Sequence, residues 1–190
     1  MRSLAFLAPL LALFLAGCGG PQPADWQLNA AQAMGQFQRL YLTGDARADA
    51  EFMLARRELA ATGREDLVAR AELLRCALRV ASLQFDDCPG FLALKAGARA
   101  EELAYAEFLS GKGAFRGSDE AVSRLVALGV RLRRGDIAPA GIAEAVDIAS
   151  AQGWRRPLLA WLGVQEKRAR DAGDADAAQR IRRRIDLISG

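Results

Sequence analysis

The chain has 190 residues, of which 52% are hydrophobic, so it is long enough and apolar enough to bury the core of one domain. A formal net charge of +3 argues against a dedicated nucleic-acid-binding protein, because such a protein carries a strongly basic patch. The sequence contains no histidine, which excludes Ser-His-Asp and Cys-His catalysis and removes the commonest metal ligand.

The first residues have the pattern of a targeting segment. A cationic start, Met1-Arg2-Ser3, precedes a short hydrophobic stretch over 4–16, and small residues follow at a cleavage site. The sequence Leu15-Ala16-Gly17-Cys18 resembles the lipobox of bacterial lipoproteins. The resemblance implies that residues 1–17 are removed as a signal peptide, that Cys18 receives a diacylglyceryl thioether, and that its new amino group takes a fatty acyl chain such as palmitate. We therefore expect Cys18 to be the lipidation site.

A membrane helix and a core helix both fit this segment less well. A retained membrane helix needs about 20 apolar residues, whereas this run is shorter and contains Pro9. A helix buried in the core could not continue through Gly19, Gly20, Pro21 and Pro23.

Residues 18–25 are expected to be the lipidated cysteine and a flexible tether, which holds the body at most about 23 Å from the lipid. The residue after the lipidated cysteine bears on which membrane holds the anchor. Gly19 is not the aspartate that commonly signals inner-membrane retention in such lipoproteins. The resemblance thus favours the outer membrane, with the body facing the periplasm, and the inner membrane stays open as the alternative.

Residues 26–190 are predicted to form a single all-α domain. Apolar residues recur at spacings of three and four, and β-branched residues are too sparse and scattered to build strands. Glycine and proline separate the apolar stripes, at positions typical of helix ends and helix starts. The pattern predicts helices near 27–43, 46–61, 64–83, 89–109, 119–133, 139–151, 156–172 and 175–188.

Short turns between these helices predict antiparallel hairpins, stacked as an array or as a compact α–α bundle. Leu42-Thr43-Gly44-Asp45 and Trp161-Leu162-Gly163 resemble pieces of tetratricopeptide repeats, which implies a similar architecture rather than membership of that family. Three glycines are expected within helices: Gly97, Gly129 and Gly163. Since glycine weakens a helix by about 1 kcal/mol, we expect another helix to pass close to each of them.

Two cysteines remain once Cys18 is assigned to lipid. Cys76 lies within a predicted helix and Cys88 at the start of the next. We expect a disulfide between them, because disulfides persist in an oxidising compartment. Two buried free thiols are the alternative, and a redox-active pair is disfavoured because the Cys-x-x-Cys spacing is absent.

No set of residues in the sequence converges on a catalytic site, a metal or a cofactor. Gly111-Lys112-Gly113 lacks the remaining residues of a phosphate-binding loop and is expected to be a connection. Carboxylate catalysis, as in cell-wall glycosidases, stays possible. The candidate acids, each of which also fits a turn, a helix start or a solvated face, are Asp86, Asp87, Glu101, Glu102, Asp119 and Glu120.

The large aromatic side chains are expected to pack in the core, although a groove lined by some of them could receive a helix or peptide. They are Phe37, Tyr41, Phe52, Tyr105, Phe108, Trp154 and Trp161.

The most basic segment lies near the C-terminus, where four arginines interrupt an isoleucine stripe. These residues, Arg180, Arg182, Arg183 and Arg184, either form a solvated face or contact anionic lipid or an acidic partner. We expect a non-catalytic interaction module of an envelope assembly, bound to the membrane by its lipid and to a protein partner. The alternative is a carboxylate-dependent peptidoglycan enzyme or a sugar-binding protein, which would need close acids in one concave pocket.

Overall fold

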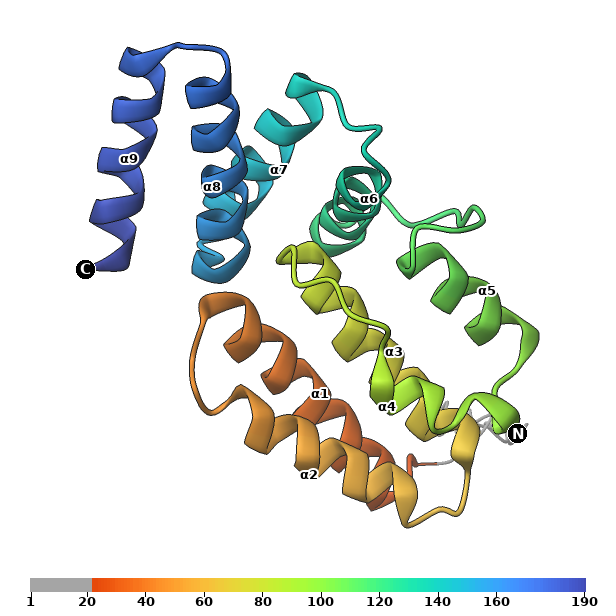
Figure 1. Ribbon diagram of the computed structural model, residues 1–190. Helices are drawn as coiled ribbons and strands as arrows, with labels where there is room; N and C mark the ends of the chain where they lie inside the picture. The colour runs from red at the N-terminus through yellow and green to blue at the C-terminus, as the bar shows by residue number, and fades with distance from the viewer. Residues whose placement is uncertain (1–21) are drawn as a thin grey trace, which may run out of the picture.

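The computed structural model describes residues 22–190, and within that range the regular secondary structure is entirely helical (Figure 1). The lipobox and Cys18 lie outside the described residues. The elements are α1 (Asp25–Thr43), α2 (Ala48–Ala60), α3 (Glu65–Ala81), α4 (Pro89–Leu92), the 3-10 turn η1 (Lys95–Gly97), α5 (Ala100–Leu109), α6 (Ala121–Arg134), α7 (Pro139–Ala151), α8 (Arg155–Asp171) and α9 (Ala175–Ser189). The predicted all-α fold is confirmed. None of these helices is long and apolar enough to cross a membrane.

The prediction of one helix over 89–109 is wrong, because this stretch is divided into α4, η1 and α5. The segment lies against α3 so closely that a Cβ at Gly90 would overlap the carboxylate of Glu72. A new helix then begins where the Glu102 carboxylate accepts a hydrogen bond from the backbone N–H of Arg99. Contact with α3 and this capping bond therefore favour a divided segment over one continuous helix.

Helix α3 lies at the centre of the arrangement. It contacts α1 and α2 on one side and α4, η1, α5 and α6 on the other (Figure 1). Sequence neighbours pair in the hairpins α1–α2, α7–α8 and α8–α9, as the short turns predict. Helices α5 and α6 instead contact α3 more extensively than each other, so the middle of the chain is a bundle rather than a regular array.

Another helix passes close to two of the three glycines for which this was predicted. At Gly129 of α6, a Cβ would lie 2.5 Å from the carbonyl oxygen of Val80 in α3, so glycine lets the two backbones approach. Gly163 lies within α8 but has nothing within 4 Å of its Cβ position, and that prediction is wrong. Gly97 lies in η1 rather than in a long helix, but α3 does pass close to it, since a Cβ at Gly97 would lie 3.0 Å from the Cβ of Glu65, the first residue of α3.

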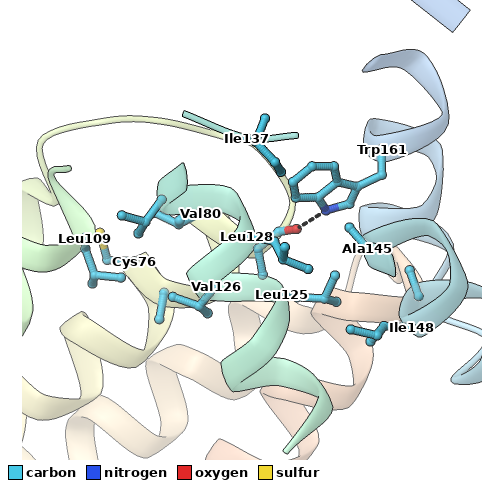
Figure 2. Close-up of a cluster of buried hydrophobic side chains, with 14 of the residues drawn as sticks. Cys76, Val80, Leu109, Leu125, Val126, Leu128, Ile137, Ala145, Ile148 and Trp161 are labelled. Atoms are coloured by element: carbon cyan, nitrogen blue, oxygen red, sulfur yellow. Dashed lines mark hydrogen bonds between the residues drawn. The ribbon is translucent and has the colours of Figure 1, made fainter. Parts of the chain in front are cut away.

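The main core lies between α3, α6, α7 and α8, and Figure 2 shows Trp161 reaching from α8 toward the other core side chains. Trp161 is fully buried, and its Nε1 donates a hydrogen bond of 3.1 Å to the carbonyl of Ala81 at the end of α3. Helix α8 also reaches α1, because Arg156 Nε donates to the carbonyl of Tyr41 over 2.7 Å. Late and early segments of the chain therefore close on each other.

The predicted core placement of the aromatic side chains is confirmed. Five of them are buried and two are partly buried against the core. The buried ones are Phe37, Tyr41, Phe52, Phe108 and Trp161, and the others are Tyr105 and Trp154.

Candidate functional site

A half-open hollow of about 550 Å³ lies between α5 and the segment that leads from α3 into α4. Such a volume falls within the usual range of ligand pockets. Its lining mixes apolar and charged side chains, and Phe91 is the one aromatic residue in it. The predicted aromatic groove is therefore not what this hollow provides. The lining residues are Asp86, Asp87, Cys88, Phe91, Leu92, Lys95, Leu103, Ala106, Glu107, Ser110 and Lys112.

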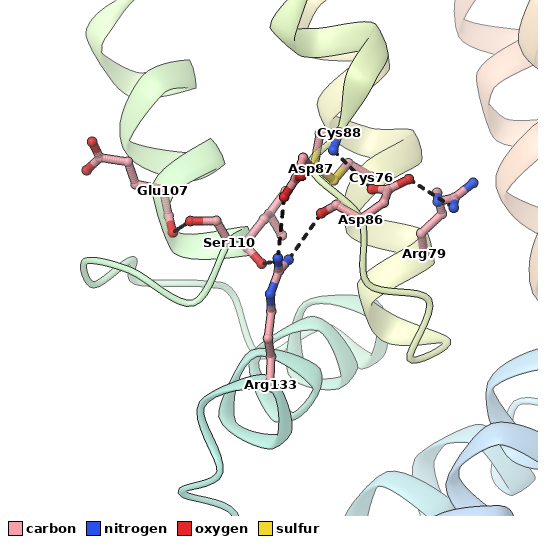
Figure 3. The surroundings of a disulfide bond; sticks show 9 residues. Cys76, Arg79, Asp86, Asp87, Cys88, Glu107, Ser110 and Arg133 are labelled. Atoms are coloured by element: carbon pink, nitrogen blue, oxygen red, sulfur yellow. Dashed lines mark hydrogen bonds and ion pairs between the residues drawn. A yellow bond between two sulfur atoms is a disulfide. The ribbon is translucent and has the colours of Figure 1, made fainter.

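The predicted disulfide is confirmed and fixes one edge of this hollow (Figure 3). Cys76 is buried in α3, and its Cα lies 5.6 Å from that of Cys88. Cys88 takes a left-handed backbone conformation with φ of 51°, which is uncommon for a residue with a side chain. Its N–H donates a hydrogen bond of 3.0 Å to Oδ1 of Asp86. The sulfur atoms, being bonded to each other, are not available as thiolate metal ligands.

Asp86 connects the disulfide segment to the surrounding helices. Its carboxylate lies 2.9 Å from Nη2 of Arg79, an ion pair to α3. Its carbonyl accepts a hydrogen bond of 3.2 Å from Arg133 of α6, which also donates to the carbonyl of Leu109 at the end of α5 (Figure 3). Asp86 thus positions the wall of the hollow through its carboxylate and its backbone.

Of the other predicted acids, Asp87 alone lines the hollow. The Asp87 side chain is 89% exposed and lies 3.9 Å from Arg133. Glu101, Asp119 and Glu120 are exposed and line no part of the hollow. Glu107, which was not predicted from the sequence, does line it. It follows Leu103 by four positions, so the helical period was the signal that could have placed it there.

Glu102 is buried and has a structural partner rather than an open site. Its carboxylate pairs with Arg70 of α3 and accepts the N–H of Arg99. Burial raises its pKa, but the hydrogen bonds from Arg70 and Arg99 and their positive charges outweigh burial, and the pKa of Glu102 lies below its ordinary value.

Two further buried acids, missed from the sequence, follow the same pattern. Glu72 of α3 pairs with Arg56 of α2 over 2.8 Å. Glu166 of α8 lies 2.9 Å from Arg170 on its own helix and 3.6 Å from Arg182 of α9. Glu72 and Glu166 thus join neighbouring helices, as Glu102 joins α5 to α3.

The four C-terminal arginines lie on α9, which packs mainly on α8. Two of them are engaged at its flanks: Arg182 pairs with Glu166 and Asp186, and Arg184 donates a hydrogen bond to Ser150 of α7. Within residues 22–190, Arg180 and Arg183 have no ion pair and are exposed. The predicted basic face is therefore divided between two structural arginines and two free ones.

The free arginines share the outer face of α9 with an exposed apolar side chain. Arg180, Arg183 and Leu187 follow at spacings of three and four, which places them in one row. Leu187 is 83% exposed. The opposite side of α9, with Ile181 and Ile185, is partly buried against the core.

Comparison of the chain with protein-family models, with curated proteins and with solved structures gives no match.

Proposed function

We propose that the protein is an outer-membrane lipoprotein whose helical body faces the periplasm and acts as a non-catalytic interaction module of an envelope assembly. The sequence Leu15-Ala16-Gly17-Cys18 supports the anchor. The disulfide between Cys76 and Cys88 fits an oxidising compartment. Neither observation depends on the other.

The outer face of α9, defined by Arg180, Arg183 and Leu187, is the surface we assign to the partner. The observation that carries this assignment is the concentration of charge in α8 and α9. Residues 155–190 contain nine arginines and lysines against five acids, a formal net charge of +4, whereas the whole chain carries +3. Positive charge beside an exposed leucine suits an acidic protein surface with an apolar centre.

The position of α9 favours a protein over lipid as the partner. Figure 1 places α9 and the start of α1 at opposite sides of the molecule. The lipid anchor precedes α1, and α8 contacts α1 near its far end, a helix length of about 28 Å away. A body held by its N-terminus therefore presents α9 away from the anchoring membrane.

The anchor is tested by growing cells with a palmitate analogue and isolating the protein. We expect label on the wild-type chain and none on Cys18→Ser, together with a mature mass that lacks residues 1–17. An unmodified leader, or recovery of the protein from the cytosol, would overturn the proposed location.

The partner surface is tested with a photo-crosslinking amino acid at position 187 in intact cells. We expect one protein crosslink that is lost in Arg180→Ser/Arg183→Ser and kept in the control Arg39→Ser/Arg116→Ser, which removes the same charge from exposed sites. The purified partner should bind through acidic residues, and salt should weaken that binding. Crosslinking to lipid alone, or equal crosslinking in both double variants, contradicts the assignment.

A second candidate function, a carboxylate-dependent peptidoglycan enzyme or a sugar-binding protein, has one observation in its favour. Asp86, Asp87 and Glu107 line the same hollow. Asp86 is engaged by Arg79, so this function would rely on the exposed pair Asp87 and Glu107. Turnover or binding of purified peptidoglycan that Asp87→Asn and Glu107→Gln abolish would support it. Equal signals from wild type and both variants would exclude it.

A further inference from the structure

An exposed apolar surface lies on the α1–α2 hairpin, and neither the disulfide hollow nor α9 takes part in it. Leu28 is 54% exposed, Met53 56% and Leu54 37%. Two shallow hollows of about 680 and 300 Å³ adjoin there and share Leu54 as a wall. Their lining comes from α1 and α2 alone, so no other helix described covers them. We call Leu28, Met53, Leu54 and Arg57 the hairpin face.

The hairpin face lies near the point where the chain enters the body. Helix α1 begins at Asp25, so Leu28 belongs to its first turn. Helix α2 runs back along α1, and Leu54 shares a hollow with Asn29. Leu54, which follows Met53 directly, therefore lies near the start of α1, where Leu28 also lies.

The length of chain before α1 determines what this face can reach. Residues 18–25 extend at most about 23 Å, while a helix with its side chains is about 10–12 Å across. A lipid on Cys18 thus keeps the α1–α2 hairpin within about two helix diameters of the bilayer. At that distance, the apolar interior of the bilayer lies within reach of these side chains.

We propose that the hairpin face rests on the phospholipid surface in which Cys18 is anchored, with Leu28, Met53 and Leu54 in the boundary between headgroups and acyl chains. This inference rests on the proposed lipid anchor and adds an orientation to it. Exposed apolar side chains on a helix that lies flat favour this boundary. The bilayer then covers a surface that water covers in the free protein.

Charges beside the hairpin face give it no net positive charge to attract an anionic surface. Arg56 is paired with Glu72, and Arg57 is exposed and can reach headgroup phosphates. Glu51 and Glu58, which line the second hollow, oppose an anionic surface. The contact is therefore mainly apolar, and salt should not weaken it, unlike the contact assigned to α9.

The experiment places a nitroxide label on the full lipidated protein in vesicles of phosphatidylethanolamine with a minority of phosphatidylglycerol. A single introduced cysteine is the one free thiol, since Cys18 carries lipid and Cys76 is bonded to Cys88. Labels are compared at Met53→Cys and at Ala143→Cys, an exposed position on α7 used as the control. Collision with oxygen, which concentrates in lipid, and with a water-soluble nickel complex reports the surroundings of each label.

We expect the ratio of oxygen to nickel collisions to be at least roughly threefold higher at position 53 than at position 143, at low and at high salt. Equal ratios would overturn the proposal. Protection of position 53 from both reagents would also overturn it, because that result means coverage by protein.

Flotation of the same vesicles separates this inference from the function on which it rests. Protein that floats with the vesicles but shows equal ratios retains its anchor and loses only the proposed orientation. Protein that does not float has no anchor, and both proposals then fail. The variant Met53→Ser/Leu54→Ser should still float while a label at Leu28→Cys loses its lipid signal.

Discussion

Replacing Gly129 with alanine should destabilise the protein, although the same change in an ordinary helix is stabilising. Alanine is favoured over glycine inside a helix by about 1 kcal/mol. In α6, however, the added Cβ would lie 2.5 Å from the carbonyl oxygen and 3.0 Å from Cγ1 of Val80. The sign of the change in stability therefore depends on whether α3 can move away.

The magnitude follows from the shortfall in that contact. Carbon–oxygen contacts between neighbouring backbones are about 3.3–3.6 Å, so the two helices would have to separate by about 0.8 Å. The atom to be displaced is backbone rather than the end of a flexible side chain, and Val80 is itself buried. Overpacking of this kind costs about 1–3 kcal/mol. After the gain of about 1 kcal/mol in helix propensity, we expect the free energy of unfolding to fall by up to about 2 kcal/mol.

Gly163→Ala is the matched control, because Gly163 lies within α8 and has nothing within 4 Å of its Cβ position. We expect it to raise the free energy of unfolding by up to about 1 kcal/mol. Denaturant unfolding followed by far-ultraviolet circular dichroism measures both variants, and the two should differ by the overpacking cost, about 1–3 kcal/mol. If Gly129→Ala stabilises as much as the control, the close crossing of α3 and α6 is wrong.

Three further predictions concern the buried charges, the disulfide and a tyrosine. The folded-state pKa of Glu102 lies below its ordinary value of 4.5, so wild type should be more stable than Glu102→Gln at neutral pH. Wild type should lose that advantage as the pH falls through the folded-state pKa. A stability difference that does not change with pH in denaturant titrations would contradict the pairing with Arg70. Cys76→Ser/Cys88→Ser should lose about 3 kcal/mol of unfolding free energy, measured in the same assay, because the bond closes a short loop, and an unchanged midpoint would show that the bond adds nothing. Burial raises the pKa of Tyr105 to about 12, so its phenolate absorbance in Tyr41→Phe should develop well above pH 10, and titration at its ordinary value of 10.0 would place the ring in water.

The helices that could be predicted well are those whose ends are determined by residues of the same segment. The predicted range 139–151 matches α7, which Pro139 begins, and 175–188 is one residue shorter than α9. The predicted helix over 89–109 failed because its interruption depends on Gly90 meeting Glu72, a residue of another helix. The apolar periodicity of one segment does not show which residues of another helix it will contact.

The candidate site shows the same division between local and distant causes. The disulfide could be predicted because the proposed oxidising compartment, rather than the fold, favours it. The arginine partners of the buried residues Glu72 and Glu166 could not be predicted, since a glutamate on a helix has the same local sequence pattern whether it faces water or an arginine. Gly129 and Gly163 also look alike in sequence, and only the path of α3 distinguishes them.

Closure of α8 on α1 and α3 also bears on how the chain matures. Its two closing hydrogen bonds, from Arg156 to Tyr41 and from Trp161 to Ala81, join positions 115 and 80 residues apart. A nascent chain therefore cannot form these two hydrogen bonds until α8 has left the ribosome. If the protein is exported as we propose, that delay keeps the polypeptide unfolded while it passes through a translocation channel.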